Sequence, residues 1–220
     1  MSSPSPLQLP SNLNVSSIKN LIFDLGDVLL KVNQNASAVK FQDFEATNPN
    51  ALPDKFNLFR TGKVNAQDFR AAVRLSTGLP SSVTDAQLDE AWSAILGDFA
   101  SGRLELIQKL RRDSGYKVYV LSNSDPILTE SLNKIIAEHH NERSLDPFFD
   151  KVFYSHAIGF EKPDKRAFMS VIDDQHLVPG ETLFLDDSAV NIDAATSCGL
   201  QAARVDITTD LSPLSRTQEH

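Results

Sequence analysis

The 220-residue sequence contains one cysteine, Cys198, so no disulfide can form within the chain. It also lacks any run of about 18 consecutive apolar residues, the length that a membrane-spanning helix needs. Basic residues are outnumbered: 21 Lys and Arg stand against 29 Asp and Glu, and the formal net charge is -8. A field of that sign repels nucleic acids and anionic membranes, so we expect neither as a partner.

What is present is typical of a soluble globular protein, with 41% hydrophobic and 23% charged residues. We interpret Cys198 as a small buried hydrophobe, and a lone thiol is compatible with a reducing compartment. Residues 1–16 contain no basic residue and match neither a secretory signal nor a transit peptide. We therefore expect a cytoplasmic protein, monomeric or homodimeric, with flexible tails over residues 1–16 and 208–220.

Short apolar runs that suit buried strands alternate with helical patterns along most of the chain. Such alternation predicts an α/β fold, a Rossmann-like parallel sheet with helices on both faces. A helix after Ser188 with Gly199 just past its end fits this scheme. The predicted strands are residues 18–24, 117–121, 152–155, 182–185 and 201–205.

One segment, residues 33–103, interrupts the alternation and shows no convincing strand. Thr84 and Gln87 form a capping box, and apolar residues at helical spacing continue from Leu88 to Leu96. Asn65 precedes a second amphipathic helix. We expect an inserted helical cap at 33–103 and an α/β core domain made of residues 17–32 and 104–207.

Polar residues stand where the predicted strands end and in one loop. Ligands of open α/β sheets bind beyond the carboxyl ends of the strands, so these residues are expected to share one site. Taken singly, each has an ordinary explanation as a turn, a helix cap or a solvated charge. The residues are Asp24, Ser122, Asn123, Lys162, Asp186 and Asp187.

These residue types suit phosphoryl transfer. A carboxylate such as that of Asp24 can attack phosphorus and form an aspartyl-phosphate, which divides one difficult step into two. The carboxylate and the phosphate are both anions and repel each other. A Mg²⁺ ion held by a few carboxylates can bridge them. Lys162 would screen charge on the phosphoryl oxygens, and the Ser122 hydroxyl would hold one of them.

The segments around Asp24, Ser122, Lys162 and Asp186 resemble, in this order, the four motifs of the haloacid dehalogenase-like (HAD) hydrolase superfamily, and the resemblance covers about residues 17–207. Segments 21–29 (Leu-Ile-Phe-Asp-Leu-Gly-Asp-Val-Leu) and 154–164 (Tyr-Ser-His-Ala-Ile-Gly-Phe-Glu-Lys-Pro-Asp) match the branch with a helical cap after the first strand. The resemblance implies that Asp24 is the nucleophile and Lys162 stabilises the phosphoryl group. It implies phosphate binding by Ser122, Asn123 and Lys162, and magnesium binding by Asp24, the Gly26 carbonyl, Asp186 and Asp187.

One position departs from the usual pattern of the family. Most HAD phosphatases carry an acid–base aspartate two residues after the nucleophile, where this chain has Gly26. Asp27 follows one residue later and could replace that acid, although the shift by one position changes its direction. General acid–base help is worth about 10² to 10⁴-fold, so we expect a slower enzyme or one that relies on a good leaving group.

The resemblance implies a magnesium-dependent phosphatase of a small-molecule phosphomonoester. The aromatic residues of the cap would suit a sugar phosphate, a nucleotide or an isoprenoid-like phosphate, and they could equally form the core of the cap. Alternatives are a catalytically impaired phosphometabolite-binding protein, favoured by Gly26, and a dehalogenase, opposed by the paired aspartates. The cap residues concerned are Phe56, Phe59, Arg60, Phe69 and Trp92.

Overall fold

The computed structural model describes residues 5–11 and 13–215 of the chain. Its centre is a sheet of five parallel strands in the order β6-β5-β2-β7-β8. This sheet confirms the predicted parallel α/β architecture. The strands are β2 (Asn20–Phe23), β5 (Lys117–Ser122), β6 (Lys151–Tyr154), β7 (Thr182–Asp186) and β8 (Gln201–Arg204).

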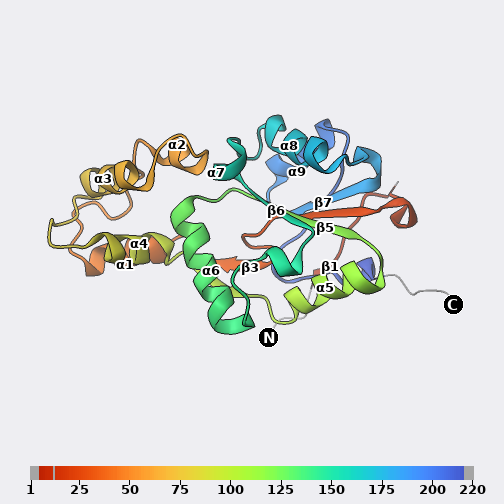
Figure 1. Ribbon diagram of the computed structural model, residues 1–220, viewed down its shortest axis with the longest axis horizontal. Coiled ribbons are helices and arrows are strands. Elements are labelled where there is room, and N and C mark those ends of the chain that lie inside the picture. The colour runs from red at the N-terminus through yellow and green to blue at the C-terminus, as the bar shows by residue number, and fades with distance from the viewer. Residues whose placement is uncertain (1–4, 12, 216–220) are drawn as a thin grey trace.

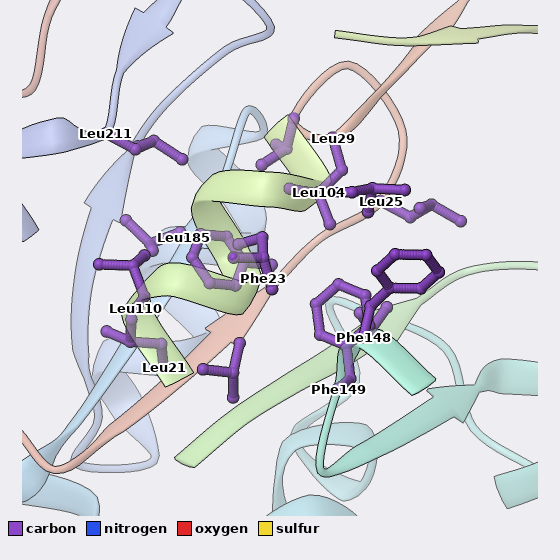
Figure 2. Close-up of a cluster of buried hydrophobic side chains, with 14 of the residues drawn as sticks. Leu21, Phe23, Leu25, Leu29, Leu104, Leu110, Phe148, Phe149, Leu185 and Leu211 are labelled. Carbon is purple, nitrogen blue, oxygen red and sulfur yellow. The ribbon is translucent and has the colours of Figure 1, made fainter. Parts of the chain in front are cut away.

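Helices cover both faces of this sheet (Figure 1). Alternate residues of a strand point to opposite faces, and β2 shows the consequence. Leu21 and Phe23 lie in one apolar cluster with the helices α5 and α6, whereas Ile22 lies in another with α8. Figure 2 shows the first cluster, in which Leu21 and Phe23 of β2 gather with Leu104 and Leu110 of α5. The helices are α5 (Arg103–Asp113), α6 (Pro126–His140), α7 (Ser155–Ile158), α8 (Lys165–Gln175) and α9 (Ala189–Ser197).

Residues 33–95 form a helical lobe beside the sheet, which we name the helical insertion (Figure 1). It has its own buried cluster, which includes Phe59 and Phe69. The structure confirms the Thr84–Gln87 capping box and the Asn65 cap. The helices of the insertion are α1 (Ala36–Asp43), α2 (Phe56–Arg60), α3 (Ala66–Thr77) and α4 (Asp85–Ser93).

The insertion is joined to the core through two short antiparallel strands, β3 (Leu30–Val32) and β4 (Leu96–Phe99). The expectation that residues 33–103 hold no strand is therefore wrong. Helix α4 ends at Ser93, and Leu96 pairs with Val32 instead of continuing the helix. Strand β4, Leu-Gly-Asp-Phe, is only partly buried and has no continuous apolar run of the kind that predicts a buried strand.

The described parts of both expected tails contact the core, which corrects the expectation of free tails there. Strand β1 (Ser5–Pro6) pairs in parallel with β9 (Thr209–Asp210). Leu211 and Leu214 are buried in the main cluster. Residues 1–4, 12 and 216–220 lie outside the described part. The described residues also form four short 3-10 helices: η1 (Val15–Ser17), η2 (Asp146–Phe148), η3 (Pro179–Glu181) and η4 (Ser212–Leu214).

Within the described ranges, no helix is both long and apolar enough to cross a membrane. Cys198 follows α9, is half-buried and packs against the cluster on the α8 side of the sheet.

Candidate active site

The site begins where the central strand ends. Strand β2 lies in the middle of the sheet, with β5 and β6 on one side and β7 and β8 on the other. The strand order therefore changes direction at β2, and Asp24 directly follows this strand at the switch point. The Asp24 amide donates to the Leu185 carbonyl over 2.8 Å. Asp186 is the last residue of β7. Adjacent parallel strands therefore place two carboxylates side by side, as the sequence predicts.

Lys162 brings a positive charge between these two carboxylates. Its Nζ lies 2.5 Å from Asp24 Oδ1 and 2.7 Å from Asp186 Oδ2. The side chains of Lys162 and Asp186 are 1% and 0% exposed, and that of Asp24 is 12% exposed. Asp24 is thus the most exposed of the three. Buried charges persist when they are paired and hydrogen-bonded, and this trio meets both conditions.

The same burial sets the acid–base properties of the trio. Burial raises the pKa of Asp24 to about 6, with Asp186 adding to the rise and Lys162 opposing it. Burial alone would lower the pKa of Lys162, but the two adjacent carboxylates outweigh it and the pKa lies above its ordinary value. At neutral pH Asp24 is therefore mainly a carboxylate and Lys162 an ammonium.

Two asparagines hold the trio in position. Asn123 donates from Nδ2 to the Lys162 carbonyl and accepts from the Lys162 amide, both over 2.8 Å. These two hydrogen bonds position the backbone of Lys162. They also engage the side-chain amide of Asn123, which the sequence suggests as a phosphate contact. Asn191 of α9 donates from Nδ2 to both oxygens of Asp186, over 3.0 and 3.1 Å. Asn191 carries no motif signal in the sequence, and only the fold shows its role.

The remaining predicted residues surround the same space. Asp24, Asp186 and Asp187 each offer a carboxylate oxygen, and these oxygens lie within 4.8 Å of one another. Such a set of hard oxygen donors fits Mg²⁺, which takes few carboxylates and keeps several waters. Burial, followed by the charge of Asp186, raises the pKa of Asp187. Ser122 is 5% exposed and lines the cavity beside Asp24.

The loop after Asp24 turns sharply at Gly26 and Asp27. Asp27 has a φ of +52°, and its Oδ1 accepts the Val32 amide over 2.9 Å. One of its carboxylate oxygens is thus committed to the turn. A Cβ at Gly26 would lie 3.1 Å from Val32 Cγ2. Val32 therefore crowds the position where most HAD phosphatases carry the acid–base aspartate.

A cavity of about 490 Å³ opens from Asp24 toward the helical insertion. One end is polar and is formed by Asp24, Ser122, Lys162 and Asp187. The insertion supplies most of the other end. Asp186 is buried behind this surface, where it accepts a hydrogen bond from Lys162.

The insertion contacts the core on two sides of this cavity. On one side Arg60 Nη2 forms an ion pair with Glu161 Oε2 over 2.7 Å, next to Lys162. The Ser155 hydroxyl also donates to the Arg60 carbonyl over 2.7 Å. On the other side Trp92 Nε1 donates to Asp125 Oδ2 over 3.0 Å. These long-range contacts have no signal in the sequence.

The comparison with protein families decides the assignment. The model of the haloacid dehalogenase-like hydrolases matches residues 18–199, which include every residue of the site. The chain belongs to this hydrolase family. The candidate site residues lie at the carboxyl ends of β2, β5 and β7 and in the loop between α7 and α8.

Three similar proteins illustrate the family. A D-ribitol-5-phosphate phosphatase of Bacteroides thetaiotaomicron is 28% identical over 191 residues, which are 84% of this chain and 90% of that protein. A sesquiterpene phosphatase of Aspergillus oryzae is 27% identical over 186 residues, 84% of this chain and 88% of that protein. A HAD family enzyme of Bacteroides thetaiotaomicron, crystallised with magnesium and inorganic phosphate, has a TM-score of 0.76 and 30% identity. That comparison covers 90% of this chain and all of the solved one.

Proposed function

We propose that this HAD hydrolase is a magnesium-dependent phosphatase that removes phosphate from a small-molecule monoester by way of an aspartyl-phosphate on Asp24. The observation that carries the proposal is the buried trio, in which Lys162 bridges Asp24 and Asp186 at the floor of a cavity. Relatives named as phosphatases support it. We further propose that the helical insertion serves as the cap over this site.

Each residue then has a defined part in the reaction. A carboxylate oxygen of Asp24 attacks phosphorus, and the bond from phosphorus to the leaving oxygen breaks. The leaving oxygen takes a proton from water, since Gly26 offers none. Water then attacks phosphorus, and the bond from phosphorus to the Asp24 oxygen breaks, which frees inorganic phosphate and restores the carboxylate. The proton that the attacking water loses neutralises the hydroxide left by the first step. Lys162 and the Ser122 hydroxyl hold the phosphoryl oxygens while charge moves among them.

The metal would be held by Asp24, the Gly26 carbonyl, Asp186 and Asp187. When bound, Mg²⁺ would supply positive charge that lowers the repulsion between the anionic nucleophile and the phosphate. Asn123 acts by fixing the Lys162 backbone, and Asn191 by fixing Asp186.

Phosphate release from an aryl phosphate and from a panel of phosphomonoesters, with Mg²⁺ and with EDTA, tests the proposal. We expect magnesium-dependent release that Asp24→Asn abolishes. The matched control is Asp54→Asn, which removes an exposed carboxylate of the insertion and should keep full activity. Tight magnesium-dependent binding of a phosphorylated compound without any turnover would contradict the proposal and favour a binding protein.

A further inference from the structure

We propose that the substrate of this phosphatase has an apolar leaving group, a chain or ring that bears its phosphate at one end, and that polyol phosphates are poor substrates. The inference rests on the proposed phosphatase function and concerns the part of the cavity that lies beyond Asp24.

The walls of that part are largely hydrocarbon. The insertion and strand β4 turn a set of aromatic and aliphatic side chains toward the cavity, and they face the polar end formed by Asp24 and Lys162. Burying apolar surface there removes it from water, at about fourfold in affinity for each methylene. The side chains are those of Phe41, Leu52, Phe56, Trp92, Ile95 and Leu96.

Polar partners for hydroxyl groups are few in the same region. The charged one, Arg60, pairs with Glu161 through Nη2 and lies 4.9 Å from the centre of the Phe56 ring, and its buried Nε has no hydrogen-bond partner among the described residues. The polar atom of Trp92 is committed to Asp125. Gln34, Ser37 and Asn50 remain. A polyol would bring several hydroxyls out of water against hydrocarbon, and unpaired hydroxyls lower affinity.

The indole ring of Trp92 is held in one orientation by its neighbours. Its ring meets Phe56 edge-on with centroids 5.7 Å apart, and Phe69 edge-on at 4.9 Å. The hydrogen bond from Nε1 to Asp125, which is fully buried, holds the ring from the side of the core. Since both neighbours and the hydrogen bond restrain it, the indole offers a preformed apolar face, and binding against it costs little ordering entropy.

Hydrolysis of matched primary alkyl phosphates tests the inference, because butyl, hexyl and octyl phosphate share one leaving-group chemistry and differ only in chain length. We expect kcat/KM to rise about fifteenfold from butyl to hexyl when both added methylenes are buried. Glycerol phosphate and a pentitol phosphate should fall below butyl phosphate. A flat series, or a preference for the polyols, overturns the inference while magnesium-dependent turnover keeps the proposed function. No release from any compound overturns both.

Two exposed leucines of the insertion provide a variant pair that should fold. Leu52 lines the cavity although it is 65% exposed, whereas Leu75 on α3 is 84% exposed and is not among the lining residues. Leu52→Asn should lower the hexyl-to-butyl ratio of kcat/KM at least threefold, and Leu75→Asn should leave it unchanged. Equal ratios in both variants would overturn the inference.

The single tryptophan gives a readout that needs no turnover. In Asp24→Asn, octyl phosphate should shift the emission of Trp92 to shorter wavelength, and inorganic phosphate should not. An unchanged emission at saturating octyl phosphate counts against an apolar ligand beside Trp92.

Discussion

Replacing Asp125 tests how firmly the insertion is fixed to the core. Asp125 precedes α6, and its Oδ1 accepts the amides of Ile127 and Leu128, both over 2.9 Å. Its Oδ2 accepts Trp92 Nε1 from the insertion. One buried carboxylate thus caps a helix and joins the two parts of the chain.

The magnitude of Asp125→Ala follows from these bonds. Loss of an N-cap costs about 1 kcal/mol, and the Trp92 N–H left without its acceptor costs about 1–3 kcal/mol. We expect a loss of about 2–4 kcal/mol in the free energy of unfolding. For a chain of this size that corresponds to a fall in melting temperature of roughly 4–16 °C.

Chemical denaturation of Asp125→Ala, with Asp164→Ala as the matched control, measures this loss. Asp164 also caps a helix, by accepting the Arg166 amide over 2.9 Å, but its side chain is 35% exposed. Its removal should cost only about 1 kcal/mol. A double-mutant cycle of Asp125→Ala with Trp92→Phe should give a coupling of about 1 kcal/mol. Equal losses in the two Asp→Ala variants, together with zero coupling, would refute the reasoning.

Two further predictions concern the catalytic face. Lys162→Met leaves Asp24 and Asp186 side by side without their cation, so the metal-free protein should lose about 3–5 kcal/mol in urea denaturation at neutral pH, and added Mg²⁺ should restore part of it. A denaturation midpoint like that of the unaltered chain would contradict this. Gly26→Asp together with Val32→Ala, which removes the methyl that crowds position 26, should raise kcat for alkyl phosphates by at least about tenfold and change aryl phosphates little. Equal effects on both substrate types would show that leaving-group protonation does not limit the rate.

The sequence predicts the central sheet well because its three middle strands, β5, β2 and β7, are buried on both faces. Leu21, Ile22 and Phe23 form a continuous apolar run that ends at a carboxylate, and β7 repeats the pattern. Strand β4 escapes prediction because Leu96 continues the helical spacing from Leu88, and the strand is only partly buried. The terminal strands β1 and β9, of two residues each, are too short to leave a pattern.

The site, like the fold, has residues that the sequence predicts and residues that it does not. Asp24, Lys162 and Asp186 are predictable because each stands at a strand end or in a motif, and the topology must bring such ends together. The partners of these residues are not predictable. Asn191 reaches Asp186 because α9 begins beside β7, and Trp92 reaches Asp125 across 33 positions of sequence. The Trp92 bond depends on how α4 packs against α6, which local sequence does not encode, and the Asn191 bond depends on how the chain turns from β7 into α9.

The paired strands β3 and β4 have a consequence for how this enzyme can change over time. The Asn33 amide donates to the Ile95 carbonyl over 2.8 Å, and the Ala100 amide to the Leu29 carbonyl over 3.0 Å. The two ends of the insertion are thus fastened together like the base of a hairpin. A segment held in this way can lengthen, shorten or be exchanged while the strands beneath it keep their positions. With the insertion as the proposed cap, we infer that changes in this segment can alter which substrate is accepted and leave the residues around Asp24 in place.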